Sequence, residues 1–213
     1  RALEMATETA IKMCKSALHD HLEGGFHRYT VDRQWSTPHF EKMLYDQGLL
    51  LEAFTLLYAS CKSEEILNGM RSIYRFVCER LSSDDGRFYC AQDADSLNIG
   101  GEKEEGAFAV WTASELKELL PVEEYNLICD TFGVTEHGNA VNLPGVNCLN
   151  KLKGVVGVEG KYADYNDRLI NAMKILYSTR EKRPQPHRDE KIVTAWNGLM
   201  ISGLAKASLY IPE

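Results

Sequence analysis

The sequence has 213 residues and a net charge of −7, and it is 44% hydrophobic and 26% charged. This composition is typical of a folded globular domain that is long enough to bury a sizeable core. The acidic balance argues against a nucleic-acid-binding protein and against a protein that binds anionic membranes, because both need a basic surface.

The first third of the chain is expected to be helical. Periodic apolar residues predict a helix over 2–22 and a stronger one over 39–60. Pro38 is placed at the start of the second helix, with Ser36 or Thr37 as its N-cap. Since apolar side chains lie nearly all round this second helix, we expect an inner helix that is buried on both sides.

The middle of the chain mixes helices with short extended runs. Residues 63–81 are apolar on one face only, which is typical of an outer helix. The runs 87–91 and 107–111 have β character and could pair as a small hairpin. Thr112 is expected to cap a short helix over 113–120.

Three more helices are predicted over 122–132, 162–179 and 194–210, and the last of them is apolar enough to be an inner helix. A weak internal echo links 38–50 with 186–200, since Pro-His, Glu-Lys and Gln/Asn-Gly-Leu recur there in order. Repeated helical hairpins stack because one hairpin cannot bury its own apolar face. Chance matching of short strings is the alternative.

Two histidines, His39 and His187, occupy equivalent positions in this echo. Two imidazoles across one cavity could remove a proton and return it, as a sugar epimerase or isomerase requires. His39 and Asp46 would lie two turns apart on the 39–60 helix, where Lys42 is spaced to pair with Asp46. The alternatives are a satisfied His39, a structural Asp46 and a solvent-exposed His187.

Carboxylates and aromatic residues add to the candidate site. Asp93 and Asp95 are the residue type that glycoside hydrolases use in pairs, although residues this close need a partner from another loop, such as Glu41. Asx turns or caps are their alternative role. Trp35 and Trp196 offer flat faces suited to a sugar ring, with core packing as the stronger alternative for Trp196.

The six cysteines include no CxxC pair, so reduced thiols are expected rather than a zinc site or a disulfide framework. No spacing is diagnostic of a metal site, and neither a metal nor another cofactor is expected. The sequence has no run of 18 apolar residues, so no membrane span is expected. We expect a cytoplasmic protein, while the start at Arg1 leaves secreted and organellar forms open.

Four stretches, GGFHRYTVDRQWSTPHFEKMLYDQ, FYCAQDADS, EGAFAVWT and PHRDEKIVTAWNGLM, occur in this order. Together they resemble the spermatogenesis-associated protein 20 family over nearly the whole chain. The resemblance implies an all-α fold, part of an (α/α)₆ toroid of the six-hairpin glycosidase type, with a small inserted β-hairpin. Residues 1–213 would be the N-terminal part of that toroid, without the family's thioredoxin-like domain and the later hairpins. Inner helices left exposed on the open side would favour self-association.

The resemblance also implies where a site would lie. The catalytic candidates are His39, His187, Asp93 and Asp95, and the substrate-binding candidates are His27, Arg28, Trp35, Glu41, Asp46, Lys191, Trp196 and Asn197. Gln92 and Cys90 depart from the family pattern, and the missing carboxylate at Gln92 weakens the case for a hydrolase. We expect a pocket that binds or converts a small sugar, as an epimerase, isomerase or glycoside hydrolase would. The alternative is a non-catalytic scaffold that supports a redox or fertility-related role through the thioredoxin-like domain in cis.

Overall fold

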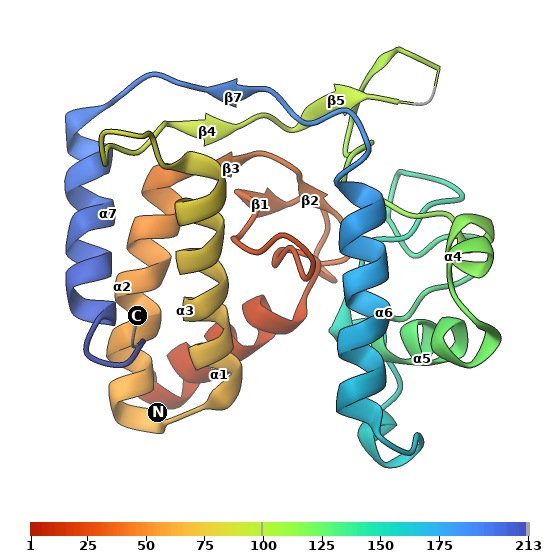
Figure 1. Cartoon of the computed structure of the whole chain (residues 1–213). Coiled ribbons are helices and arrows are strands. Elements are labelled where there is room, and N and C mark those ends of the chain that lie inside the picture. Colours follow the sequence, from red (N-terminus) through yellow and green to blue (C-terminus); the bar gives the residue numbers. More distant parts are fainter. Residues whose placement is uncertain (99, 212–213) are drawn as a thin grey trace.

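The structure is a computed structural model that describes residues 1–98 and 100–211, so Ile99, Pro212 and Glu213 lie outside the described residues. The described residues are mostly helical, with three small sheets (Figure 1). The helices are α1 (Ala2–Lys15), α2 (Leu44–Cys61), α3 (Glu64–Phe76), α4 (Ala113–Leu119), α5 (Val122–Phe132), α6 (Tyr165–Arg180) and α7 (Thr194–Ala207). A π-helical turn (Val77–Leu81) extends α3, and two 3₁₀ turns cover Lys151–Lys153 and Val158–Gly160.

The strands are short and antiparallel. They are β1 (Tyr29–Thr30), β2 (Pro38–His39), β3 (Lys42–Met43), β4 (Ala91–Gln92), β5 (Asp95–Leu97), β6 (Lys103–Glu105) and β7 (Arg188–Asp189). β1 pairs with β2 and β5 with β6, while β3, β4 and β7 form one sheet with β4 at its centre. Figure 1 shows this three-stranded sheet running across one end of α2, α3 and α7.

Helices α2 and α7 lie side by side, and both begin at the three-stranded sheet (Figure 1). Glycines allow their backbones to approach closely. A Cβ atom on Gly48 would lie 2.9 Å from the backbone of Leu199, and one on Gly203 would lie 2.7 Å from the Gly48 carbonyl oxygen. The two helices are therefore adjacent, and the segments that precede them lie at the same end.

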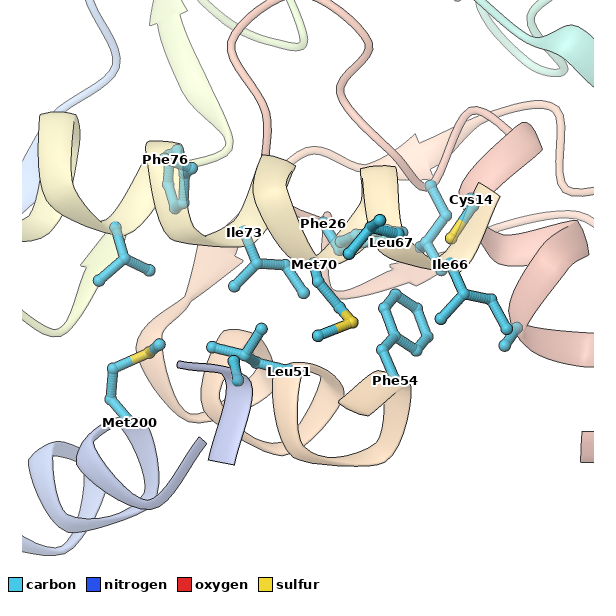
Figure 2. Packing of buried hydrophobic residues seen from close by; sticks show 14 of the residues in the cluster. Cys14, Phe26, Leu51, Phe54, Ile66, Leu67, Met70, Ile73, Phe76 and Met200 are labelled. Carbon is cyan, nitrogen blue, oxygen red and sulfur yellow. The ribbon is translucent and has the colours of Figure 1, made fainter. Parts of the chain in front are cut away.

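The apolar interior has two large clusters and a small third one of Ala17, Phe40, Ala94 and Cys148. The largest lies among α1, α2, α3 and α7, and Figure 2 shows its packing, with Phe54 and Met70 in the middle of the view. The second cluster gathers around Trp111, which is completely buried, and joins α4, α5 and α6. The two large clusters correspond to the two groups of helices that Figure 1 shows on either side of the molecule.

The predicted helix over 39–60 is wrong at its start. Pro38–His39 and Lys42–Met43 are strands, and α2 begins only at Leu44, whose N–H donates to the Cys90 carbonyl at 2.8 Å. Pairing with a strand far away in the sequence thus overrides local helix propensity. His39 and Asp46 therefore do not share a helix face, and Lys42 does not pair with Asp46.

Two further boundaries differ from the prediction. The first helix ends at Lys15 rather than at residue 22, because the Ser16 hydroxyl bonds the Met13 carbonyl and accepts from Leu18 N–H. The predicted hairpin of 87–91 with 107–111 is wrong as well. β4 pairs with β3 and β7, and the hairpin that forms is β5–β6.

Other local predictions are confirmed. α3 and α5 lie where apolar periodicity puts them, and the Thr112 hydroxyl caps α4 by accepting from Glu115 N–H at 3.1 Å. The prediction that the inner helices are buried on both sides is not confirmed, because the exposed fractions of Leu49 and Leu56 on α2 are 49% and 60%. Within residues 1–98 and 100–211, no helix is both long and apolar enough to cross a membrane.

Candidate functional site

The candidate site lies where the three-stranded sheet meets the first turn of α2. Lys42 is opposite Gln92, and Gln92 is opposite Arg188, so the next residues outward, Glu41 and Asp93, are neighbours across the sheet. Side chains alternate between the two faces of a strand. Because Lys42 is only 1% exposed and points inward, Glu41 projects toward the open side.

Asp46, in the first turn of α2, carries the most perturbed carboxyl group at this end. Its Oδ2 is buried and has no hydrogen-bond partner among the described residues. Burial raises the pKa of Asp46 to about 6, the charge of Arg28 opposes the rise and the charge of Glu41 adds to it. A carboxyl group with this pKa is present in both protonation states near neutral pH, as a general acid or base must be.

Arg28 and an aromatic pair lie near the first turn of α2. The Arg28 guanidinium donates from Nη1 to Glu41 Oε2 at 3.1 Å, and Arg28 N–H donates to the Glu41 carbonyl at 2.9 Å. Tyr45 meets Trp196 of α7 edge to face, with ring centroids 4.9 Å apart. The first turn of α2 is thus close to the Arg28–Glu41 pair, whose charges act on Asp46, and its Tyr45 contacts α7.

His39 lies in a carboxylate-lined position on β2. Its Nδ1 is 2.6 Å from Glu105 Oε1, its Nε2 is 3.7 Å from Glu41 Oε2, and its ring stacks on Tyr29 at 4.9 Å. Glu105 comes from β6, so the β5–β6 hairpin completes this part of the site. An imidazole between two carboxylates can hold or transfer a proton.

His187 has different surroundings. Its side chain is exposed and borders an open cavity of about 490 Å³, which Gln92 and Arg188 also line. Its carbonyl accepts from Asp93 N–H at 2.8 Å. The structure thus brings His187 to the same sheet as Glu41, but the reaction that needs His39 and His187 on two sides of one carbon stays a prediction.

The other predicted carboxylates and Lys191 form surface ion pairs. Lys103 Nζ lies 3.5 Å from Asp93 Oδ2 and 3.6 Å from Asp95 Oδ2, so one cation bridges both. Lys191 is exposed and lies 3.0 Å from Asp189. These groups can reach a ligand, but neither aspartate is desolvated as Asp46 is.

Three predicted binding residues hold the fold. His27 is buried, its Nδ1 bonds the Phe40 carbonyl at 2.9 Å, and burial lowers its pKa to about 3, with the charge of Lys42 acting in the same direction. Asn197 clamps Phe88 by accepting from its N–H and donating to its carbonyl, both at 2.9 Å. Trp35 has a left-handed backbone, with φ 57°, and its carbonyl accepts from Asn150 at 3.0 Å.

A buried ion-pair network beneath the site escaped the sequence reasoning. Lys42 Nζ donates to Asp20 at 2.8 Å and to Glu23 at 2.7 Å, and Arg180 donates to both Asp20 oxygens at 3.0 Å. Burial alone would raise the pKa of Asp20, but Arg180 and Lys42 outweigh it and hold that pKa well below its usual value. The only signal in the sequence is that charged residues stand at helix ends amid apolar ones.

In residues 1–98 and 100–211, no group of three or more His, Cys, Asp and Glu side chains is arranged to hold a metal ion. The free cysteines Cys14, Cys90 and Cys148 are buried, and burial raises the thiol pKa of Cys14 and of Cys148 to about 12. Thiols with such pKa values are poor nucleophiles.

Comparison with known proteins gives a consistent picture. No family model matches the chain. An uncharacterized protein of Caenorhabditis elegans is 36% identical over 97% of the chain, and spermatogenesis-associated protein 20 from human and from mouse is 37% identical over 96%. The chain spans 31% of the nematode protein and 29% of each mammalian protein, less than a third of each relative.

Proposed function

Because this chain is homologous to part of spermatogenesis-associated protein 20, we propose that it belongs to a helical toroid whose α2–α7 end binds and converts a small sugar. Two observations support the toroid. α2 and α7 are adjacent, and both begin at one sheet (Figure 1), whose strands include Lys42, Gln92 and Arg188. Both also keep exposed apolar side chains, such as Leu56 and Ile201, which further helices of a ring would cover.

The observation that carries the proposed chemistry is the carboxyl group of Asp46. It is partly desolvated, one of its oxygens is unbonded, and its pKa of about 6 is suited to proton transfer at neutral pH. As a carboxylate, Asp46 would take a proton from a carbon next to the sugar carbonyl. The His39–Glu105 pair is the second proton carrier, and it would return a proton in the epimerase or isomerase reaction.

Sugar recognition is supported by the surrounding groups. The Tyr45–Trp196 pair offers apolar ring surface for the C–H face of a sugar. Arg28, Glu41 and Lys103 supply donors and acceptors for hydroxyl groups. A glycoside hydrolase would instead need two opposed carboxylates, and Asp93 and Asp95 share one lysine at the surface rather than flanking a gap.

The second candidate is a non-catalytic scaffold for the longer protein. It is favoured by the ion pairs within the site, since Arg28 already binds Glu41 and His39 already binds Glu105. In that role these pairs would only fix β2, β3 and the β5–β6 hairpin. Any redox or fertility-related activity would then depend on a thioredoxin-like domain in cis.

Solvent isotope exchange distinguishes the two candidates. The full-length protein is incubated in D₂O with aldoses, ketoses and N-acylated amino sugars, and deuterium in the recovered sugar is measured by NMR. The enzyme proposal predicts exchange into at least one sugar, lost in Asp46→Asn and retained in Asp85→Asn, a surface carboxylate of the turn before β4. Absence of exchange with every sugar would favour the scaffold, whereas full exchange in Asp46→Asn would rule out Asp46 as the base.

A further inference from the structure

A polar opening beside the three-stranded sheet has no role in the proposed chemistry. It is an open cavity of about 490 Å³ between the end of the α3 π-turn and the β4–β7 edge. The side chains that bear on its chemistry are Arg80, Gln92, His187, Arg188 and Glu190. This volume is large enough for a phosphorylated or carboxylated monosaccharide.

Gln92 provides the first indication of a ligand. It lies on the central strand β4 and is only 6% exposed, and its side-chain amide has no hydrogen-bond partner among the described residues. The amide atoms of Gln92 are not among the fully buried polar atoms that lack a partner, so they face the open cavity, where solvent or a ligand can reach them. Since Gln92 lines the cavity, a ligand there could supply the missing partner.

The guanidinium groups of the cavity wall are held in fixed positions. Arg188 donates from Nη1 to the Arg80 carbonyl at 3.2 Å, and it lies over the Tyr89 ring at 4.4 Å. Arg80 is anchored by buried Glu23, with Nε 2.7 Å from its Oε1, and by Glu181. Fixed guanidinium groups are the usual receptors for carboxylate and phosphate oxygens.

Arg188 in the cavity wall already pairs with one carboxylate, that of Glu190. Its carboxylate lies 2.6 Å from Arg188 Nη2, and its side chain is 60% exposed. An exposed pair of this kind contributes little stability and exchanges readily with other anions. His187 is exposed at the rim and adds a further donor beside Arg188.

We propose that this cavity binds the oxyanion of a small metabolite, a phosphate or a carboxylate group. The oxyanion replaces Glu190 on Arg188, while His187 and the Gln92 amide donate to its remaining oxygens. The binding involves no covalent step. It does not require proton transfer at Asp46, so it stands independently of the proposed sugar conversion.

Calorimetric titration of the full-length protein tests the site. Inorganic phosphate is expected to bind saturably, and Arg188→Gln should weaken binding about tenfold, as for loss of a charge-assisted hydrogen bond. Gln92→Leu and the surface variant His187→Gln should each weaken it severalfold. Arg168→Gln is the matched control, because Arg168 lines a separate open cavity of about 500 Å³ and also pairs with glutamates.

Glucose 6-phosphate, glucuronate and glucose distinguish the sources of the oxyanion. Glucose 6-phosphate should compete with inorganic phosphate if the site prefers a phosphate group, and glucuronate should compete if it prefers a carboxylate. Glucose, which carries neither group, should not compete. Asp46→Asn should bind phosphate as the unmodified protein does, so a failed sugar conversion would leave this proposal intact. Unchanged phosphate affinity in both Arg188→Gln and Gln92→Leu, or equal loss in Arg168→Gln, would overturn it.

Discussion

Asp20, which is buried, and Asp46, which is half-buried, show how neighbours set the chemistry of a residue. Asp20 is paired with Lys42 and Arg180 and stays ionised, whereas Asp46 keeps an unbonded oxygen and a pKa raised to about 6. Asp20 therefore stabilises the fold as a charge. The charged form of Asp46 destabilises the fold, and the same unfavourable surroundings raise its pKa and make it suited to exchange a proton.

Removing the Asp46 charge should stabilise the protein in alkaline solution. A raised native pKa means that the folded state binds this proton more tightly than the unfolded state does, so the cost is present above about pH 6 and disappears toward pH 4. After discounting for partial solvent exposure, we expect Asp46→Asn to gain about 1 kcal/mol at pH 8.

Urea unfolding at pH 8 and pH 4.5 measures this gain, which should be much smaller at the lower pH. Asp85→Asn is the control, because its pKa is lowered by hydrogen bonds from Arg87 and Ser83 and no gain is expected. A less stable Asp46→Asn protein at pH 8 would mean that the carboxylate is satisfied in the native state.

Three histidines with lowered pKa values, of which His27 is buried and His19 and His21 are half-buried, predict sensitivity to mild acid. Burial lowers the pKa of His19 to about 4 and of His27 to about 3, and it lowers that of His21 well below 6.5. Below pH 6.5 these groups take up protons only in the unfolded state. Stability should therefore fall by up to about 4 kcal/mol per pH unit, reduced by about 1.4 kcal/mol per unit from the opposite titration of Asp46.

Urea midpoints at pH 7.5 and pH 5.5 test this, and the midpoint should be clearly lower at pH 5.5. His27→Asn keeps a donor for the Phe40 carbonyl but does not titrate, so its pH dependence should be shallower. Equal midpoints at the two pH values would show that the histidines are accessible to protons in the folded protein.

At the scale of elements, the contact of α2 with α7 depends on glycines. A Cβ on Gly203 would come 2.7 Å from the Gly48 carbonyl oxygen, which belongs to a rigid helix backbone. We expect Gly203→Ala to lower the free energy of unfolding by about 2 kcal/mol despite the better helix propensity of alanine.

Gly198, on the same helix, is the matched control, because a Cβ there meets no atom within 4 Å. Gly198→Ala should leave stability unchanged or raise it by up to about 1 kcal/mol. Thermal unfolding of both variants gives the answer. Equal effects from the two substitutions would show that α2 and α7 do not pack as closely as the structure has them.

Local patterns predict elements whose stabilising contacts are local. α3 and α5 follow from apolar periodicity, and the cap of α4 follows from Thr112. The start of α2 could not be predicted, because β3 forms only through pairing with β4, about 50 residues further on. The same holds for the site, where Glu105 and Arg180 arrive from distant elements and no local signal marks Asp46 as the desolvated carboxyl group.

At the scale of the whole molecule, a buried ion pair joins the two groups of helices. Arg180 ends α6, Asp20 follows α1, and both side chains are almost fully buried. Lys42 ties β3 to the same carboxylate. The polar network therefore holds the sheet end of the molecule, and with it the candidate site, in place between the two hydrophobic clusters.

Breaking this link should affect the whole fold. Arg180→Met leaves Asp20 with one cation fewer in a buried position, and we expect a loss of about 3 kcal/mol in urea unfolding. The double variant Asp20→Asn/Arg180→Met should recover part of that loss, since no carboxylate is then left short of charge. A single variant as stable as the unmodified protein would contradict a structural role for the pair.

The central claim is that Asp46 exchanges a proton near neutral pH at the α2–α7 end. Carboxyl ¹³C NMR titration of the full-length protein measures this directly, with the Asp46 resonance assigned by its absence in Asp46→Asn. The account predicts a midpoint near pH 6. A midpoint near pH 4, the ordinary value for an aspartate, would contradict it.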